Sequence, residues 1–138
     1  MQYAELHCVS NFTFLRGASH PQELIHTAST LGYRALAITD ECSLAGVVKA
    51  HVAARECGLP LIIGSEFLID EQKLVILVTN RESYSELSSL ITLARRRSRK
   101  GEYRIEWSDL SNHLPNVLVI WLPSGIADTD NAIGYQLS

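Results

Sequence analysis

Short runs of apolar residues alternate along this chain with segments that have the periodicity of amphipathic helices. The apolar runs at residues 3–7, 34–39, 61–63, 66–69, 73–78 and 117–122 predict β-strands, with a kink at Gly64. Helices are expected between them, at residues 19–31, 43–57 and 80–97. Strands that are apolar on both faces and alternate with helices are typical of a parallel sheet. The sequence therefore predicts an α/β fold with parallel strands and covering helices.

Local signals place the ends and the inward faces of the first two helices. Ser19 is expected to cap the first helix, and Ser43 the second. The second helix should stop near Gly58, and its apolar face includes Leu44, Val47, Val48 and Val52.

The composition favours a single domain. With 138 residues, 46% of them hydrophobic, the chain has the size of one domain and is too apolar for a disordered segment. Its apolar runs are too short to cross a membrane, and residues 1–6 lack the pattern of a secretory signal. The three cysteines form no close pair and leave one odd, which predicts reduced thiols in a cytoplasmic protein.

Polar residues collect at the carboxyl ends of three predicted strands. His7 ends the first strand, Asp40 and Glu41 follow the second, and Glu66 lies just beyond the third. Because the carboxyl ends of parallel strands meet at one edge of a sheet, we expect these side chains to lie close together, where α/β proteins build their sites.

Common catalytic motifs are absent from the sequence. The five histidines form none of the H-x-H or H-E-x-x-H groupings that hold metal ions. A glycine-rich phosphate loop and a G-x-S-x-G elbow are also lacking. Local motifs alone therefore assign no catalytic residue.

Positive charge is concentrated in one segment. Residues 95–104 hold six of the twelve Lys and Arg residues, and the rest of the chain is acidic. One interpretation is a patch that contacts the phosphates of DNA. The other is a solvated last turn of a helix, whose cations suit the helix dipole. The candidate phosphate-contacting residues are Arg95, Arg96, Arg97, Arg99 and Lys100.

Four segments together resemble a known amino-terminal domain. They are L-H-C-V-S-N-F-T-F-L-R-G-A-S-H-P-Q-E-L at 6–24, A-L-A-I-T-D-E at 35–41, L-P-L-I-I-G-S-E at 59–66 and K-L-V-I-L-V-T-N at 73–80. They are similar to the polymerase-and-histidinol-phosphatase (PHP) domain that opens bacterial C-family DNA polymerases. The segment at 95–110 is most similar to the error-prone, mutagenesis-associated branch of that family.

This resemblance implies a PHP-type distorted (βα)7 barrel that is truncated here. Residues 1–138 would form the N-terminal part of one PHP domain, and residues 124–138 are expected to be a cut helix or a disordered tail.

The resemblance also carries metal-ligand positions onto this sequence. His7 stands at the first of them, and Glu66 keeps the acid of a G-x-E motif. Glu41, next to Asp40, stands where the family has a histidine. The resemblance therefore implies that His7, Glu41 and Glu66 are what remains of a metal site.

Three other ligand positions have lost their ligands. Val9 replaces the second histidine of an H-x-H motif, Arg16 replaces an acid or histidine, and Lys73 replaces a histidine. Valine offers no lone pair, and the other two bring positive charge to the place of a cation. We therefore expect a degenerate site in which Arg16 and Lys73 substitute for metal, and no cofactor in this chain.

The resulting hypothesis is a structural PHP platform of an error-prone DNA polymerase that acts in translesion synthesis and damage-induced mutagenesis. The resemblance implies that the full protein supplies Mg²⁺-dependent nucleotide transfer. It also implies contacts with the rest of the polymerase chain, a sliding clamp and mutagenesis accessory proteins. Weak DNA binding by the basic run and no membrane contact are expected.

Two alternatives stay open. One is a stand-alone metal-dependent phosphoesterase that retains zinc or manganese at His7, Asp40, Glu41 and Glu66. The other is an interaction module that holds a proofreading nuclease.

Overall fold

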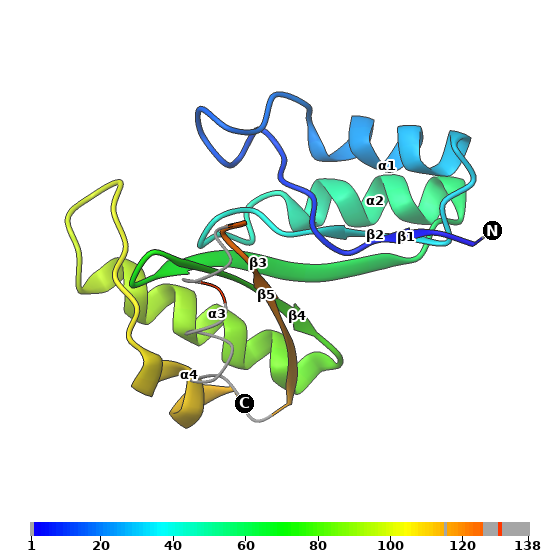
Figure 1. Cartoon of the computed structure of the whole chain (residues 1–138). Helices are drawn as coiled ribbons and strands as arrows, with labels where there is room; N and C mark the ends of the chain where they lie inside the picture. Colours follow the sequence, from blue (N-terminus) through cyan, green and yellow to red (C-terminus); the bar gives the residue numbers. More distant parts are fainter. Residues whose placement is uncertain (1, 115, 126–129, 131–138) are drawn as a thin grey trace.

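A single five-stranded sheet organises the chain, in the order β1-β2-β3-β4-β5 (Figure 1). The computed structural model describes residues 2–114, 116–125 and 130. The strands are β1 (Ala4–Glu5), β2 (Ala35–Ile38), β3 (Leu61–Ile69), β4 (Gln72–Val78) and β5 (Val117–Leu122). The described helices are α1 (Pro21–Thr30), α2 (Val47–Cys57), α3 (Arg81–Arg96) and α4 (Trp107–His113). No helix within these described residues is long and apolar enough to span a membrane.

The sheet is mixed, with a parallel part and an antiparallel part. β1, β2 and β3 run parallel, whereas β4 is antiparallel to both β3 and β5. The cause lies in the two residues between β3 and β4, since Asp70 and Glu71 have φ angles of 46° and 66°. Two consecutive positive φ values make a tight hairpin turn, and a parallel strand would need a long crossover. The α/β class is confirmed, with a mixed rather than a wholly parallel sheet.

β3 continues through Gly64, where the sequence predicts a kink. A Cβ atom at Gly64 would lie 2.5 Å from the carbonyl oxygen of Ile76 on β4. Glycine is therefore needed at this position for the close approach of the two strands, and the separate runs at 61–63 and 66–69 are one strand.

The helices pack on one face of the curled sheet. One core cluster joins α1 and α2 to β2, and a second joins α3 to β3 and β4. A third, smaller cluster lies on the opposite face, because side chains alternate along a strand. The first cluster includes Ile25, Ala28, Leu36, Ile38, Ala50 and Ala53. The second includes Phe67, Ile69, Leu74, Ile76, Leu87 and Leu90, and the third Ala37, Val75 and Leu77.

The first two helices begin later than the sequence suggests. The N-cap residue of α1 is His20 instead of Ser19, and the backbone N–H of His20 donates to Glu23 Oε2 at 2.7 Å. The N-cap residue of α2 is Gly46 instead of Ser43. Gly58 ends α2 with a φ of 70°, as expected for a left-handed C-terminal residue.

The predicted apolar face of α2 is only partly correct. Val47 is buried, and Leu44, just before the helix, packs against a core cluster. Val48 and Val52 are 73% and 52% exposed, whereas Ala50, Ala53 and Ala54 are buried. Apolar periodicity weights valine above alanine, so it misses the alanine positions that face the core.

β5 is an exposed edge rather than the buried strand that the sequence predicts. Leu118 and Val119 point to opposite faces of the sheet and are 60% and 51% exposed. Among the described strands, β5 pairs only with β4. The expected helix or tail at 124–138 lies mostly outside the described residues.

We predict that the 138-residue chain self-associates through β5. An unpaired apolar edge favours pairing with a second copy, and a charge on it opposes such pairing. Val119→Lys should therefore shift the chain toward a monomer in sedimentation velocity across a concentration series. Leu31→Lys, at the 64% exposed C-cap position of α1, is the matched control. A wild-type chain that stays monomeric and binds no hydrophobic dye would contradict this prediction.

Candidate functional site

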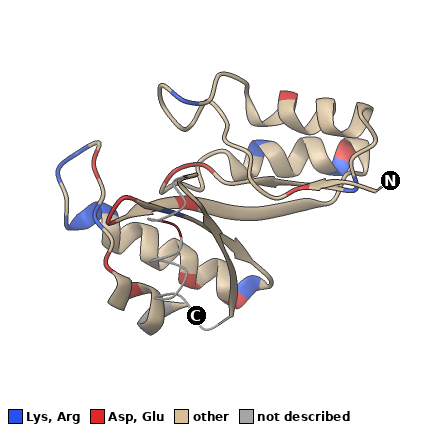
Figure 2. Cartoon of the chain, in the orientation of Figure 1, with Lys and Arg blue, Asp and Glu red and all other residues tan. Residues whose placement is uncertain are grey.

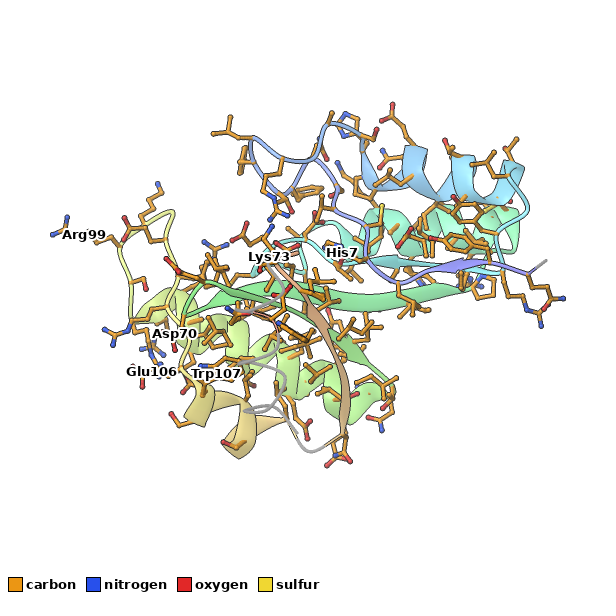
Figure 3. All side chains as sticks on the ribbon, viewed as in Figure 1. His7, Asp70, Lys73, Arg99, Glu106 and Trp107 are labelled. Carbon is orange, nitrogen blue, oxygen red and sulfur yellow. The ribbon has the colours of Figure 1, made fainter. Side chains whose placement is uncertain are left out.

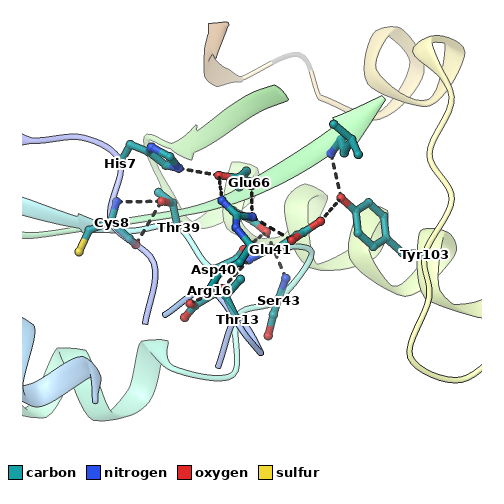
Figure 4. Close-up of polar contacts among 12 residues, drawn as sticks. His7, Cys8, Thr13, Arg16, Thr39, Asp40, Glu41, Ser43, Glu66 and Tyr103 are labelled. Atoms are coloured by element: carbon teal, nitrogen blue, oxygen red, sulfur yellow. Dashed lines mark hydrogen bonds and ion pairs between the residues drawn. The ribbon is translucent and has the colours of Figure 1, made fainter. Parts of the chain in front are cut away.

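The residues that follow β1 and β2 lie beside Glu66, which the sequence places at a strand end but which lies within β3 (Figure 4). The N–H of Glu66 donates to the carbonyl oxygen of Asp40 at 3.2 Å, which joins the segment just beyond β2 to β3. His7, just beyond β1, brings its Nε2 atom to 2.6 Å from Glu66 Oε2. Glu41 forms a parallel bridge with Glu66. The structure thus brings together the four strand-end residues that the sequence singles out.

Glu66 is the buried centre of this cluster, with 1% of its side chain exposed. Its carboxylate is held by His7 and by both terminal nitrogens of Arg16, with Nη2 at 3.1 Å from Oε2. Burial by itself raises the pKa of this carboxyl. The hydrogen bonds and charges of His7 and Arg16 outweigh burial and lower the pKa from 4.5 to about 2. Glu66 is therefore ionised at neutral pH.

Arg16 lies between two carboxylates. Its Nη1 atom donates to Glu41 Oε2 at 2.9 Å and also to Glu66 Oε1. The guanidinium reaches this position from the loop at residues 10–19, which turns sharply at Gly17. A Cβ atom at Gly17 would lie 2.0 Å from the carbonyl oxygen of Ser10, so only glycine fits this turn. The hydrogen bond to Glu66 raises the pKa of Arg16 further, and its charge is permanent.

Asp40 anchors the same loop. Its side chain is buried, and Oδ1 accepts hydrogen bonds from the Ser10 N–H and from Thr13 Oγ1, both at 2.7 Å. Oδ2 accepts from Ser10 Oγ at 2.7 Å. Because both carboxylate oxygens are engaged with the loop, Asp40 has a structural task and is not presented as a free ligand.

Two residues that the sequence does not place in this cluster complete it. Tyr103 Oη donates to Glu41 Oε1 and accepts the N–H of Leu68, both at 2.8 Å. Burial and the nearby Glu41 carboxylate raise the pKa of Tyr103. The guanidinium of Arg95 lies over the Tyr103 ring, 5.4 Å from its centroid, and donates to the carbonyl oxygen of Cys42 at 3.1 Å. Tyr103 belongs to an irregular segment without a motif, so no sequence signal identifies its role.

Lys73 is the second residue that the sequence predicts to substitute for metal. It pairs with Leu68 beside the hairpin turn, and it is exposed to solvent. The described part of the chain provides no ion-pair partner for it. The role of Lys73 as a substitute for metal therefore stays a prediction, whereas Arg16 contacts Glu41 and Glu66 directly.

The basic run lies at the end of α3 and in the loop that follows it (Figure 2), and its cations differ in their contacts. Arg95 is engaged as described, and Arg97 makes a two-pronged ion pair with Asp109 of α4, at 2.7 and 3.2 Å. Arg96, Arg99 and Lys100 are exposed and make no ion pair with any residue that the structure describes. Of the five candidate phosphate contacts, only these three are free to meet a ligand.

The strand-end residues do not fit a metal centre. A divalent cation needs several neutral or anionic ligands that converge on one point. Here the oxygens of Glu66 and Glu41 face the Arg16 guanidinium, and those of Asp40 face the loop. No three His, Cys, Asp or Glu side chains in residues 2–114, 116–125 and 130 are arranged to hold a metal ion.

The chain is similar to known proteins in sequence and in fold. Residues 5–135 match the PHP domain family. The chain is 59% identical over 128 residues to an error-prone DNA polymerase of Dechloromonas aromatica, and 54% identical over 134 residues to one of Saccharophagus degradans. These alignments cover 88% and 94% of this chain but only 12% and 13% of the relatives.

A solved structure from Bifidobacterium adolescentis, described as a metal-dependent phosphoesterase, is similar to this fold. The TM-score is 0.56 at 25% identity, over 83% of this chain and 44% of the other.

We predict that the Glu66 ion pair stabilises the fold only above acidic pH. Because the folded-state pKa lies below 4.5, this stabilisation is fully present above about pH 4.5 and is lost as the pH falls toward 2. The difference in unfolding free energy between wild type and Glu66→Gln should shrink by up to about 3 kcal/mol over this window. Urea titrations at several pH values measure it, with the exposed Glu56→Gln as control. A difference that does not change with pH would contradict the prediction.

Proposed function

This chain belongs to the PHP domain family, and from that premise we propose that it is the non-catalytic amino-terminal platform of an error-prone DNA polymerase. Two kinds of observation support the proposal. Relatives of that name match most of the chain, which spans 12–13% of their length. In addition, the strand-end cluster is organised by an ion pair rather than by open ligands.

The position of Arg16 carries the proposal. The fold family implies divalent cations at this edge, where they would relieve the repulsion among neighbouring carboxylates. In this chain a covalently attached cation contacts both Glu41 and Glu66, and His7 is held by Glu66. We derive no hydrolytic step from these residues, because they do not fit a metal centre.

The proposal assigns polymerisation to the longer protein. Nucleotide transfer by two Mg²⁺ ions, and with it translesion synthesis and damage-induced mutagenesis, would use acidic residues that this chain does not supply. The platform would contact the rest of the polymerase chain, and through it a sliding clamp, mutagenesis accessory proteins or a proofreading nuclease. Its free cysteines agree with a cytoplasmic location.

A second candidate function is a metal-dependent phosphoesterase, which the similarity to the Bifidobacterium structure favours. The two functions differ in a simple measurement. A phosphoesterase would contain stoichiometric zinc, manganese or iron after purification and would hydrolyse a phosphomonoester. The proposed platform would do neither, and stoichiometric metal with turnover would replace it by the second function.

We predict that removing the internal cation turns the cluster into a metal-responsive site. Arg16→Ala leaves the buried Glu66 without its main partner and should cost about 3–5 kcal/mol of stability. Added Mn²⁺ should then raise the melting temperature of Arg16→Ala and leave that of the wild type unchanged. The reason is that Arg16 contacts the carboxylates of Glu41 and Glu66 in the wild type, whereas the variant leaves them free to bind the ion.

Thermal melts with and without Mn²⁺ test this prediction. Arg16→Lys keeps the charge and should stay unresponsive, and Arg34→Ala is the control for an exposed arginine. A rise of many degrees in the wild type with Mn²⁺ would mean that the cluster is a metal site and that the platform proposal is wrong.

A further inference from the structure

A cavity of about 380 Å³ lies beside the strand-end cluster, between the loops at residues 10–19 and 97–104. Phe12 and Phe14 line it from the first loop, and Arg95 and Tyr103 line it from the opposite side. Figure 1 shows both loops extending beyond the strands. We call this space the two-loop cavity. Its volume lies in the range of ligand pockets, about 300–1,000 Å³.

Aromatic and apolar side chains stand unprotected on the first loop. Phe14 is 86% exposed, and Leu15 is fully exposed with a φ of 64°. Phe12 already lies under a cation, with Lys49 Nζ 5.6 Å from its ring centroid. A large apolar side chain that is not used in packing marks a surface for binding.

Positive charge is concentrated in the two segments that contribute to this cavity. The segments at residues 11–20 and 95–104 together carry seven of the twelve Lys and Arg residues and one of the fifteen Asp and Glu residues. Arg96, Arg99 and Lys100, which we call the basic rim, are exposed and lie outside the lining of the cavity, and Figure 3 shows Arg99 reaching away from the body of the chain. The carboxylate of Glu41 also lines the cavity, but Arg16 and Tyr103 engage both of its oxygens.

We propose that the two-loop cavity and the basic rim bind single-stranded DNA. An unpaired base would stack on Phe14 at the mouth of the cavity, and the neighbouring phosphates would run along the basic rim. Stacking on aromatic side chains combined with a cationic track is the general way in which proteins bind single strands without sequence preference. The choice of DNA over RNA rests on the proposed function.

Two features favour a single strand over duplex DNA and over a protein partner. Duplex bases are paired and stacked inside the helix, so they cannot enter a cavity lined by aromatic rings. A protein docked on Phe14 and Leu15 would have to place acidic residues against three unpaired cations. A polyanion with flat apolar bases matches both features at once.

Fluorescence anisotropy with a labelled oligothymidylate of about 12 nucleotides tests the proposal on the 138-residue chain. Phe14→Ala should weaken binding by about tenfold with little change in the salt dependence, because it removes stacking and no charge. Replacing Arg96, Arg99 and Lys100 together by Ala should reduce the slope of log affinity against log salt by about 2.

Matched variants distinguish binding at this site from nonspecific electrostatic binding elsewhere on the chain. Leu31→Ala removes an exposed apolar side chain elsewhere, and replacing Arg34, Arg55 and Arg81 by Ala removes three exposed charges outside the rim. Both controls should bind like the wild type. Equal losses in the controls, equal affinity for duplex DNA or no binding at low salt would overturn the proposal.

Tighter binding of oligouridylate than of oligothymidylate would overturn the assignment to DNA. The metal response of Arg16→Ala does not involve Phe14 or the rim, so this proposal and the platform proposal can fail independently.

Discussion

Two buried carboxylates, one just beyond β2 and one within β3, determine how this edge of the protein is built. An ionised group buried without partners is very costly, so Asp40 and Glu66 require hydrogen bonds or positive charge within reach. Ser10 and Thr13 meet this requirement for Asp40, and Arg16 meets most of it for Glu66. All three come from the loop between β1 and α1, so this loop has to fold back over the strand ends.

An internal guanidinium differs from a metal ion in ways that suit a platform. Arg16 neutralises Glu41 and Glu66 without depending on the supply of an ion, and it cannot act as a Lewis acid on a bound water. A buried ion pair adds little net stability compared with well-packed apolar residues in its place. Removing one partner is nevertheless costly, because the other charged group stays buried without compensation. In the proposed platform, this ion pair would preserve the geometry of the edge without metal chemistry.

The strands and the grouping of the strand-end residues follow from sequence patterns, whereas their partners do not. Apolar runs identify all five strands, and parallel order brings His7 and Glu66 to one edge. The hairpin at Asp70 and Glu71 reverses the second half of the sheet without a glycine or asparagine to signal it. Contacts such as Tyr103 with Glu41 depend on the path of an irregular segment, which residue types alone do not specify.

The loop that satisfies the buried carboxylates also presents the exposed apolar pair. Arg16 faces inward to Glu66, while Phe14 and Leu15, immediately before it, face solvent and contribute little to packing. Fixing Arg16 therefore restrains the segment that carries them. A restrained loop loses less conformational entropy when a ligand stacks on it than a mobile loop would. The ion pair of Arg16 thus restrains the adjacent surface, which connects the proposed structural role of the edge to the proposed single-stranded DNA site.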